Sequence, residues 1–217
     1  MSTEAILRDL ALVVVAYLSG SIPMGVLVAK ASGGPDPRRV GSGRTGGTNA
    51  LRALGRKWAL VVVLGDVLKG AVPVLLARLL SGDDAAIEVA CGLLAVVGAS
   101  RSIFLGFGGG RGVGTGVGTM LVILPAAVLL AAPVFVVVIL ITRYVSLGSL
   151  LSSATLAVIV ALWWLAANGS VPLAYPVYAV LGGAMVWLAH ADNIDRLLHG
   201  KERKFDLGLL SGRRQGT

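Results

Sequence analysis

The sequence has few charges and very few side chains that bind metals. Charged residues make up 14% of its 217 residues, and Cys91 is the only cysteine. Because soluble domains carry about 25% charged residues, a water-soluble globular fold is excluded. A single cysteine cannot form a disulfide framework or a thiolate cluster. His190 and His199 are the only histidines, so most histidine-rich metal sites are excluded, and neither a metal nor another cofactor is predicted.

Apolar residues are abundant instead. They make up 56% of the chain, and the mean hydropathy is +0.85. The net charge of +8 would suggest a nucleic-acid partner in a soluble protein. In a membrane protein the position of the basic residues matters more than their sum, so no nucleic-acid partner is predicted. We expect one membrane-embedded domain over residues 1–217, with a short basic tail at 198–217.

Long apolar stretches predict transmembrane helices, since a helix needs roughly 20 apolar residues to cross a bilayer. The sequence therefore predicts an all-α, polytopic membrane bundle of about seven helices. The expected spans are 7–29, 58–80, 85–105, 113–124, 126–141, 147–167 and 172–189. Only Pro125 divides the short fourth span from the fifth, so five or six spans also fit. Ser19, Ser21 and Pro23 indicate either a kink in the first helix or a polar lining.

Basic residues gather in every second connection between these spans. The connection after the first span contains Lys30, Arg38, Arg39, Arg44, Arg52, Arg56 and Lys57. The connections near Pro125 and at 168–171 contain no charge, whereas the tail is basic again. Because Lys and Arg accumulate in cytoplasmic loops, we expect the N-terminus outside, the C-terminus in the cytoplasm, and four polar stretches together on the cytoplasmic face of a bacterial cell membrane.

The stretch 41–49 is rich in glycine, serine and threonine and has basic residues on both sides. Glycines let the backbone approach an anion closely, and successive N–H groups form a nest that arginine can reinforce. Phosphate is the expected ligand, although a flexible loop would use similar residues. No Gly-Lys-Ser or Gly-Lys-Thr closes the stretch, so a nucleotide-hydrolysing P-loop is not predicted.

A second glycine-rich stretch, 106–115, contains Arg111 and leads into an expected membrane helix. A helix N-terminus offers free N–H groups and partial positive charge to a phosphate. Close helix packing would explain the glycines, but it does not explain the arginine among them. Two glycine-rich anion sites are therefore expected on one face of the membrane.

Two further pairs of polar residues have alternative explanations. Asp66 and Lys69 lie inside an expected span, where ionisable groups are costly; they form either an i, i+3 ion pair or part of a site wall. His190 and Asp195 have the His-x4-Asp spacing of soluble-type glycerolipid acyltransferases. A polar helix end explains that second pair more simply.

These motifs, in this order, resemble the bacterial acyl-phosphate:glycerol-3-phosphate acyltransferases of the PlsY family. The resemblance extends over nearly the whole chain. It rests on Gly20 to Pro23 with Lys30, Pro35 to Arg38, Gly41 to Arg52, Asp66 to Gly70, Gly109 to Thr115, Ser146 to Gly148, and His190 with Asn193, Ile194, Arg196 and Leu197.

The resemblance implies acyl transfer from acyl phosphate to the 1-hydroxyl of sn-glycerol 3-phosphate at the cytoplasmic side, the first step of phospholipid synthesis. It implies catalytic roles for Ser42, His190 and Asn193. The residues that it implies for phosphate binding are Ser42, Gly43, Thr48, Asn49, Arg52, Gly109, Gly110, Arg111, Gly112 and Arg196. Acyl phosphate is already activated, so we expect direct attack by the hydroxyl, with a donor oxygen or His190 taking the proton.

The chain departs from the family pattern at several positions. Ala99 stands where the family usually has histidine, Ser102 where it has proline, Gly108 where it has lysine, and Arg44 where it has asparagine. Arg44 or Arg101 is a candidate to replace lost charge. The alternative function is therefore a non-catalytic or transport-type membrane protein that binds a phosphorylated lipid or metabolite.

Overall fold

The structure is a computed structural model that describes residues 2–206 and 208. These residues form a bundle of α-helices with two short 3₁₀ turns. The helices are α1 (Thr3–Ser21), α2 (Met24–Ser32), α3 (Gly47–Leu54), α4 (Arg56–Ser81), α5 (Ala85–Ser100), α6 (Val113–Ile123), α7 (Pro125–Thr142), α8 (Val145–Ala166), α9 (Ala174–Ala189) and α10 (Ala191–Leu198). The 3₁₀ turns are η1 (Pro37–Arg39) and η2 (Ile103–Leu105).

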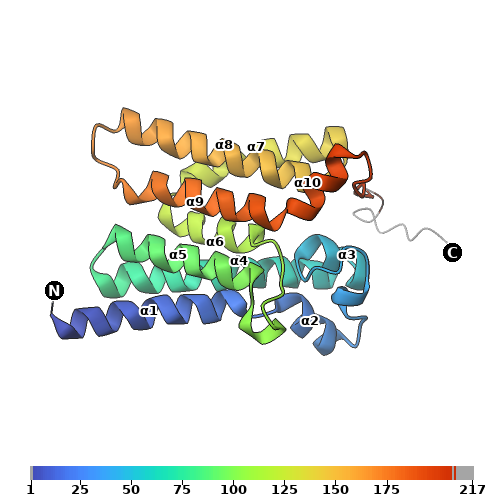
Figure 1. Ribbon diagram of the computed structural model, residues 1–217, viewed down its shortest axis with the longest axis horizontal. Helices are drawn as coiled ribbons and strands as arrows, with labels where there is room; N and C mark the ends of the chain where they lie inside the picture. The colour runs from blue at the N-terminus through green and yellow to red at the C-terminus, as the bar shows by residue number, and fades with distance from the viewer. Residues whose placement is uncertain (1, 207, 209–217) are drawn as a thin grey trace.

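The long helices lie nearly side by side in two layers (Figure 1). One layer contains α1, α4 and α5, the other contains α7, α8 and α9, and α6 lies between them. We call the end of the bundle with α2, α3, α10 and residues 101–112 the site end. We call the opposite end, where α1 begins and where α4 joins α5 and α8 joins α9, the turn end.

The predicted spans correspond closely to the apolar helices. Within the described residues, three helices, α4, α7 and α8, are long and apolar enough to cross a membrane, and up to five spans result if each of the bent pairs α1/α2 and α9/α10 counts as one. Large apolar side chains face outward along them, including Leu129 at 70% and Ile141 at 77% exposure. Such a surface suits lipid, because a soluble protein rarely exposes so large an apolar area.

Local sequence explains where several helices begin and end. The first expected span breaks at Ile22 and Pro23, because proline removes a backbone donor, and α2 leaves α1 at an angle of 46°. Helix α4 ends at Ser81, and its C-cap Gly82 has a φ of 71°, a conformation that glycine adopts without strain. The N-terminus of α5 is capped by Asp84, whose carboxylate accepts from the backbone N–H groups of Ala86 and Ile87.

The expected span 85–105 is shorter in the structure. Helix α5 ends at Ser100, and the chain then turns through η2. After this turn the chain comes back to Ser102, whose N–H donates to the Gly108 oxygen over 2.8 Å. The Ser102 hydroxyl donates to the Ser21 oxygen over 2.6 Å. The break in the first helix thus allows Ser21 to contact the segment after α5 at the site end. Within the described residues, neither Ser19 nor Ser21 lines the cavity described below.

Candidate active site

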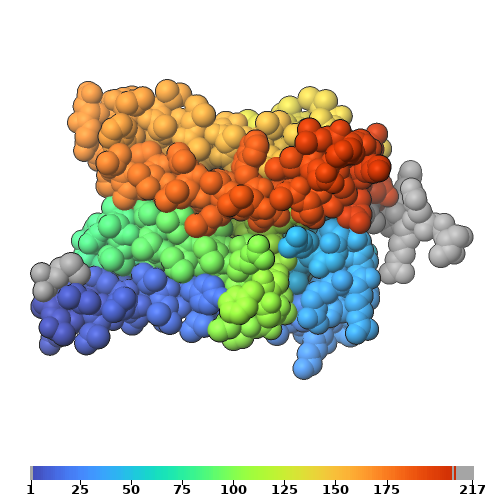
Figure 2. Space-filling model, viewed as in Figure 1, coloured from blue at the N-terminus to red at the C-terminus, as the bar shows by residue number. Residues whose placement is uncertain are grey.

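A cavity of about 800 Å³ lies at the site end, among segments that are far apart in the sequence. Its polar wall comes from residues 42–49, from 110–115 and from the chain around α10. Figure 2 shows the segment after α2, in light blue, meeting the C-terminal helices, in red, with residues 101–112 beside them in green. The polar stretches that were expected on one face of the membrane therefore do lie together around one cavity.

The first glycine-rich stretch is shaped by Asn49. Its buried amide group donates to the backbone oxygens of Pro37, Val40 and Arg44 over 2.7, 3.0 and 2.8 Å. Its Oδ1 accepts from the Ser42 N–H over 3.0 Å. The side chain of Asn49 is thus occupied by the loop backbone. It shapes the loop, and it offers no spare donor to a phosphate.

Two helix N-termini face the cavity. Helix α3 begins at Gly47 after the N-cap Gly46, and α6 begins at Val113 after Gly112; all four residues line the cavity. The first N–H groups of a helix have no partner inside it and carry partial positive charge. Two such ends in one cavity make it suited to bind phosphate groups.

The second glycine-rich stretch lies close to the end of α5. The Gly110 N–H donates to the Ala99 oxygen over 2.9 Å. A Cβ at Gly109 would lie 2.6 Å from that same oxygen, so any side chain there would push the two segments apart. The glycine at 109 therefore allows α5 to approach the loop and sets the position of Arg111.

Three arginines surround a single carboxylate beside the cavity. Asp192 is within 3.2 Å of Arg111, 3.3 Å of Arg196 and 3.8 Å of Arg44. Burial raises the pKa of Asp192, but Arg111, Arg44 and Arg196 together lower it below its usual value. Burial lowers the pKa of Arg111. Arg196 also pairs with Glu202 over 2.9 Å. Two carboxylates cannot neutralise three guanidinium groups, so the cluster keeps an excess of positive charge.

Other charges along the cavity wall increase this excess. The cationic lining residues are Arg44, Arg52, Arg56, Lys69, Arg111 and Arg203, and the acidic ones are Asp66 and Glu202. Burial lowers the pKa of Arg52, and the nearby Arg203 lowers it further. Cations that share a partly dry cavity repel one another, so an anion that enters it is stabilised.

His190 and Asn193 present polar atoms to the cavity from the junction of α9 and α10. His190 is 2% exposed, and its Nδ1 lies 2.8 Å from the Val186 oxygen. In a neutral ring Nδ1 then donates to that oxygen, which leaves Nε2 as an acceptor. Asn193 donates from Nδ2 to Glu202 over 2.7 Å. Its Oδ1, like Arg111 Nε, is buried and has no hydrogen-bond partner among the described residues.

The segment after α10 is part of the site, which the sequence did not predict. The Glu202 side chain is only 7% exposed, and it accepts from Ser146 over 3.1 Å and from Arg196 over 2.9 Å. The Phe205 N–H donates to the Arg143 oxygen over 2.6 Å, and its ring packs with Leu51 and neighbouring apolar residues. The expected basic tail thus begins inside the site; residues 207 and 209–217 lie outside the described residues. The single acid among the bases of residues 201–204 was the signal available in the sequence.

Two ambiguous pairs are resolved by the geometry. Lys69 lies 2.7 Å from Asp66, and its ammonium also donates to the Ile22 oxygen over 3.1 Å. This pair is both an i, i+3 ion pair and part of the cavity wall. The His-x4-Asp dyad is absent: Asp195 is exposed and lies 3.4 Å from His199. Asp195 follows His190 by five residues, or about 1.4 turns of helix, so the two side chains leave α10 on different sides.

Most of the residues expected to bind substrate lie together. The cavity is lined by Ser42, Thr48, Asn49, Arg52, Gly110, Arg111, Gly112, His190 and Asn193. Gly43, Gly109 and Arg196 do not line it; Gly109 supports the second loop, and Arg196 is paired with Asp192 and Glu202. Among the positions that depart from the family pattern, Arg44 and Ala99 line the cavity, Gly108 is exposed outside it, and Ser102 is buried outside it. Arg101, the other candidate to replace lost charge, is also exposed outside it.

The comparison with known families identifies the chain. Residues 10–200 match the family model described as glycerol-3-phosphate acyltransferase. The chain belongs to the glycerol-3-phosphate acyltransferase family. A glycerol-3-phosphate acyltransferase of Geobacter sulfurreducens is 44% identical over 199 residues, which cover 92% of this chain and 98% of that protein. One of Thermus thermophilus is 43% identical over 193 residues, covering 87% and 91%. The resemblance drawn from the motifs is thereby confirmed.

Solved structures of family members have the same fold. A crystal structure of PlsY, an integral membrane glycerol 3-phosphate acyltransferase in its glycerol 3-phosphate form, is 36% identical with a TM-score of 0.85. The lysophosphatidic acid form is 35% identical with a TM-score of 0.83. Both comparisons cover 95% of this chain and 100% of the other. The present chain is accordingly a multi-pass integral membrane protein of this acyltransferase family.

Proposed function

We propose that this protein transfers a fatty acyl group from acyl phosphate to the 1-hydroxyl of sn-glycerol 3-phosphate, releasing lysophosphatidate and inorganic phosphate. The observation that carries the proposal is the cavity itself. It joins an excess of arginine and two helix N-termini on one side to apolar side chains of α4 and α7 on the other. Two phosphates and one hydrocarbon tail require this combination.

The cationic wall addresses the main obstacle to the reaction, which is the repulsion between two anionic substrates. Arg44, Arg52 and Arg111 reach the cavity from three different segments. Holding both substrates in one orientation turns a bimolecular reaction into an effectively unimolecular one. Fixed cations and N–H groups also stabilise the charge that develops on the donor phosphate as its bond to the acyl carbon breaks.

The remaining polar groups suit the attacking hydroxyl. Asn193 Oδ1, which has no partner among the described residues, is an acceptor for the glycerol hydroxyl, and the Ser42 hydroxyl of the first glycine-rich stretch can donate to a phosphate. The oxygen of the hydroxyl attacks the acyl carbon, and phosphate leaves with the electrons of the broken bond. The proton passes either to an oxygen of the leaving phosphate or to Nε2 of His190.

We further propose seven membrane crossings, in a bacterial cell membrane, with the N-terminus outside and the site end in the cytoplasm. The support is the asymmetry between the two ends. The site end has Lys30, Arg38, Arg39, Arg52 and Arg203, whereas the turn end has the acids Asp83 and Asp84, and its Arg78 is bound to Glu88. Basic residues favour the cytoplasmic side, where soluble glycerol 3-phosphate is found.

Formation of lysophosphatidate and release of phosphate by the purified protein test the proposal. Palmitoyl phosphate and glycerol 3-phosphate are supplied to the intact protein and to the variants Ser42→Ala and Arg52→Ala. We expect turnover in the intact protein and a loss of roughly 10²–10³-fold in each variant, the effect of removing one well-placed donor. Arg39→Ala is the matched control, because Arg39 lies in η1 outside the cavity.

A folded protein that binds glycerol 3-phosphate but forms no product with acyl phosphate would contradict the proposal. Product from acyl-CoA or acyl carrier protein alone would retain the acyltransferase and change its donor. No product from any donor would favour the alternative, a protein that binds a phosphorylated lipid or metabolite, and Ala99 would then be the first position to restore to histidine.

A further inference from the structure

The chain after α10 forms a strap at the site end, which we define as residues 201–206. It has no regular secondary structure. It begins where the Lys201 N–H donates to the Arg196 oxygen over 2.7 Å. Of its three bases, Arg203 lines the polar cavity, whereas Lys201 and Lys204 do not. One base of the strap therefore reaches the site, although it lies outside the glycine-rich motifs.

The strap is fixed on both sides of Arg203. On one side, Glu202 accepts a hydrogen bond of 3.1 Å from Ser146 of α8. On the other side, Phe205 is 8% exposed, and its ring belongs to the apolar cluster that contains Leu51 of α3. Because the residues before and after it are anchored in this way, the backbone of Arg203 is held between α8 and α3.

Arg52 lies beside this anchor point on α3. It follows Leu51 directly, and it also lines the polar cavity. A Cβ at Gly41 would lie 3.4 Å from Arg52 Cδ, so the stem of the arginine lies along the first glycine-rich stretch. Burial lowers the pKa of Arg52, Arg203 lowers it further, and Glu202 raises it by less. The two guanidinium groups therefore lie near enough to repel each other, and the nearest acid does not offset the repulsion.

This pair of arginines differs from the three arginines around Asp192. Each of those has the Asp192 carboxylate within 3.8 Å. Among the described residues, neither the Arg52 nor the Arg203 side chain forms an ion pair or a hydrogen bond. A phosphate group carries about two negative charges and several acceptor oxygens. One phosphate can therefore accept from both guanidinium groups and cancel their repulsion.

From these observations we infer that Arg203 is a substrate-binding residue, which forms with Arg52 a clamp for the phosphate group of one substrate. The strap brings the second guanidinium to the site from the end of the chain. The inference rests on the proposed acyl transfer, in which both substrates carry a phosphate group. A basic tail near anionic headgroups explains Lys201 and Lys204, but it does not explain a base that lines the cavity.

Kinetics of two neighbouring variants test the clamp. Arg203→Ala is compared with its matched control Lys204→Ala, which removes the same charge from the next residue, exposed and outside the cavity. KM is measured for each substrate at a saturating concentration of the other. We expect Arg203→Ala to raise one of the two KM values roughly tenfold, the effect of a lost hydrogen bond to a charged group. Lys204→Ala should raise neither. The substrate whose KM rises is the one that the clamp holds.

Binding of inorganic phosphate tests the clamp without turnover. A ligand that binds the folded protein raises its unfolding temperature, so the phosphate concentration that this requires measures affinity. We expect Arg203→Ala to weaken phosphate binding roughly tenfold. Arg203→Lys should recover only part of the loss, because an ammonium lacks the planar fork of a guanidinium. In the double variant with Arg52→Ala the two losses should not multiply, because both arginines bind one phosphate.

The outcomes separate the clamp from the acyl transfer. If Arg203→Ala retains both KM values and the phosphate affinity of the intact protein, the clamp is wrong. Equal losses in Arg203→Ala and Lys204→Ala would also overturn it, because they would show a general attraction by the basic strap. If the intact protein forms no product from any acyl donor, but Arg203→Ala alone weakens phosphate binding, the acyl transfer fails and the clamp stands.

Discussion

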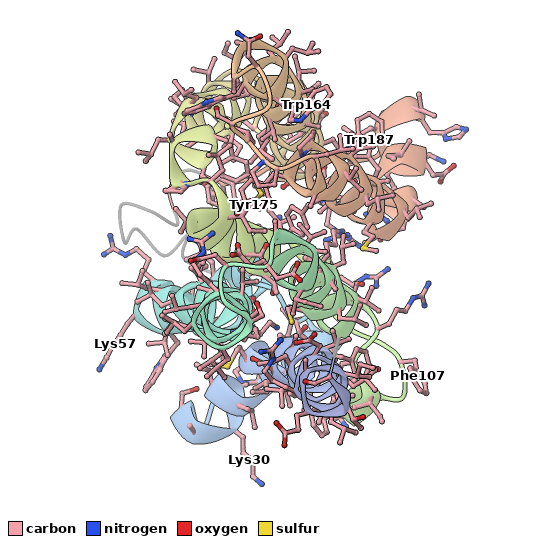
Figure 3. The ribbon with its side chains drawn as sticks, turned by 90° about the vertical axis from the view of Figure 1, so that its left-hand side faces the viewer. Lys30, Lys57, Phe107, Trp164, Tyr175 and Trp187 are labelled. Carbon is pink, nitrogen blue, oxygen red and sulfur yellow. The ribbon has the colours of Figure 1, made fainter. Side chains whose placement is uncertain are left out.

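The two ends of the bundle use the same kinds of residue in opposite ways. At the turn end, Arg78 of α4 donates to Glu88 of α5 through two bonds of 2.7 and 3.0 Å. Arg78 also donates to the Val122 oxygen over 2.8 Å, and Tyr175 of α9 donates to Glu88 over 3.3 Å. Tyr175 points inward between the layers, whereas Phe107 and Lys30 lie at the periphery (Figure 3). Four helices are joined by a neutral, fully bonded group.

At the site end, three arginines share two carboxylates, Asp192 and Glu202, and polar atoms of Arg111 and Asn193 have no partner within the described part of the chain. Buried polar groups normally have partners, so an incomplete cluster indicates a place for a ligand. A complete one, such as that of Arg78 and Glu88, indicates a structural role. In this membrane protein, an arginine whose charge is matched by a carboxylate therefore has a structural role, and arginines whose charge is not matched mark a place for an anion.

The largest effect that this comparison predicts is on stability at the turn end. Arg78→Met leaves the fully buried Glu88 without its cation, and we expect the free energy of unfolding to fall by about 3–5 kcal/mol. Thermal unfolding of the detergent-solubilised protein measures the loss. The double variant Arg78→Met with Glu88→Leu should recover most of it, because both charges are then gone. If the double variant is as unstable as the single one, the pair is not the stabilising contact.

A smaller effect is expected at Asp192, which competes with phosphate for the arginines. Asp192→Asn removes that competition, so we expect inorganic phosphate to bind about fivefold more tightly, the size of a partly exposed ion pair. Inhibition of turnover by added phosphate measures this change, with unfolding temperature as the check on stability. Weaker phosphate binding would show that Asp192 orients the arginines more than it competes for them.

The smallest effect is expected at Asp195, which is exposed and lies 3.4 Å from His199. Asp195→Asn should change neither kcat nor KM by more than about twofold, as is usual for surface substitutions. His190→Ala is the comparison variant and should lose most of the activity if the ring contacts substrate. Equal losses in both variants, measured in the same turnover assay, would restore the His-x4-Asp dyad that the structure does not show.

Much of the fold was predictable because bilayer helices are recognised from apolar length alone. The seven expected spans correspond to α1 with α2, α4, α5, α6, α7, α8 and α9. The boundary at Leu105 was wrong, since the η2 turn depends on a bond between Ser102 and Gly108 that no local pattern indicates. Helix α3 was also missed, because its glycine-rich start is typical of a loop.

The sequence by itself determined the membrane class, the family and nine of the residues that line the cavity, since these depend on composition and on motifs that lie close together in the chain. Only the tertiary structure decided which charges are matched. It placed Glu88 on Arg78, three arginines on Asp192, and Glu202 and Phe205 inside the site. Ion pairing depends on distances between helices, and a linear sequence does not contain those distances.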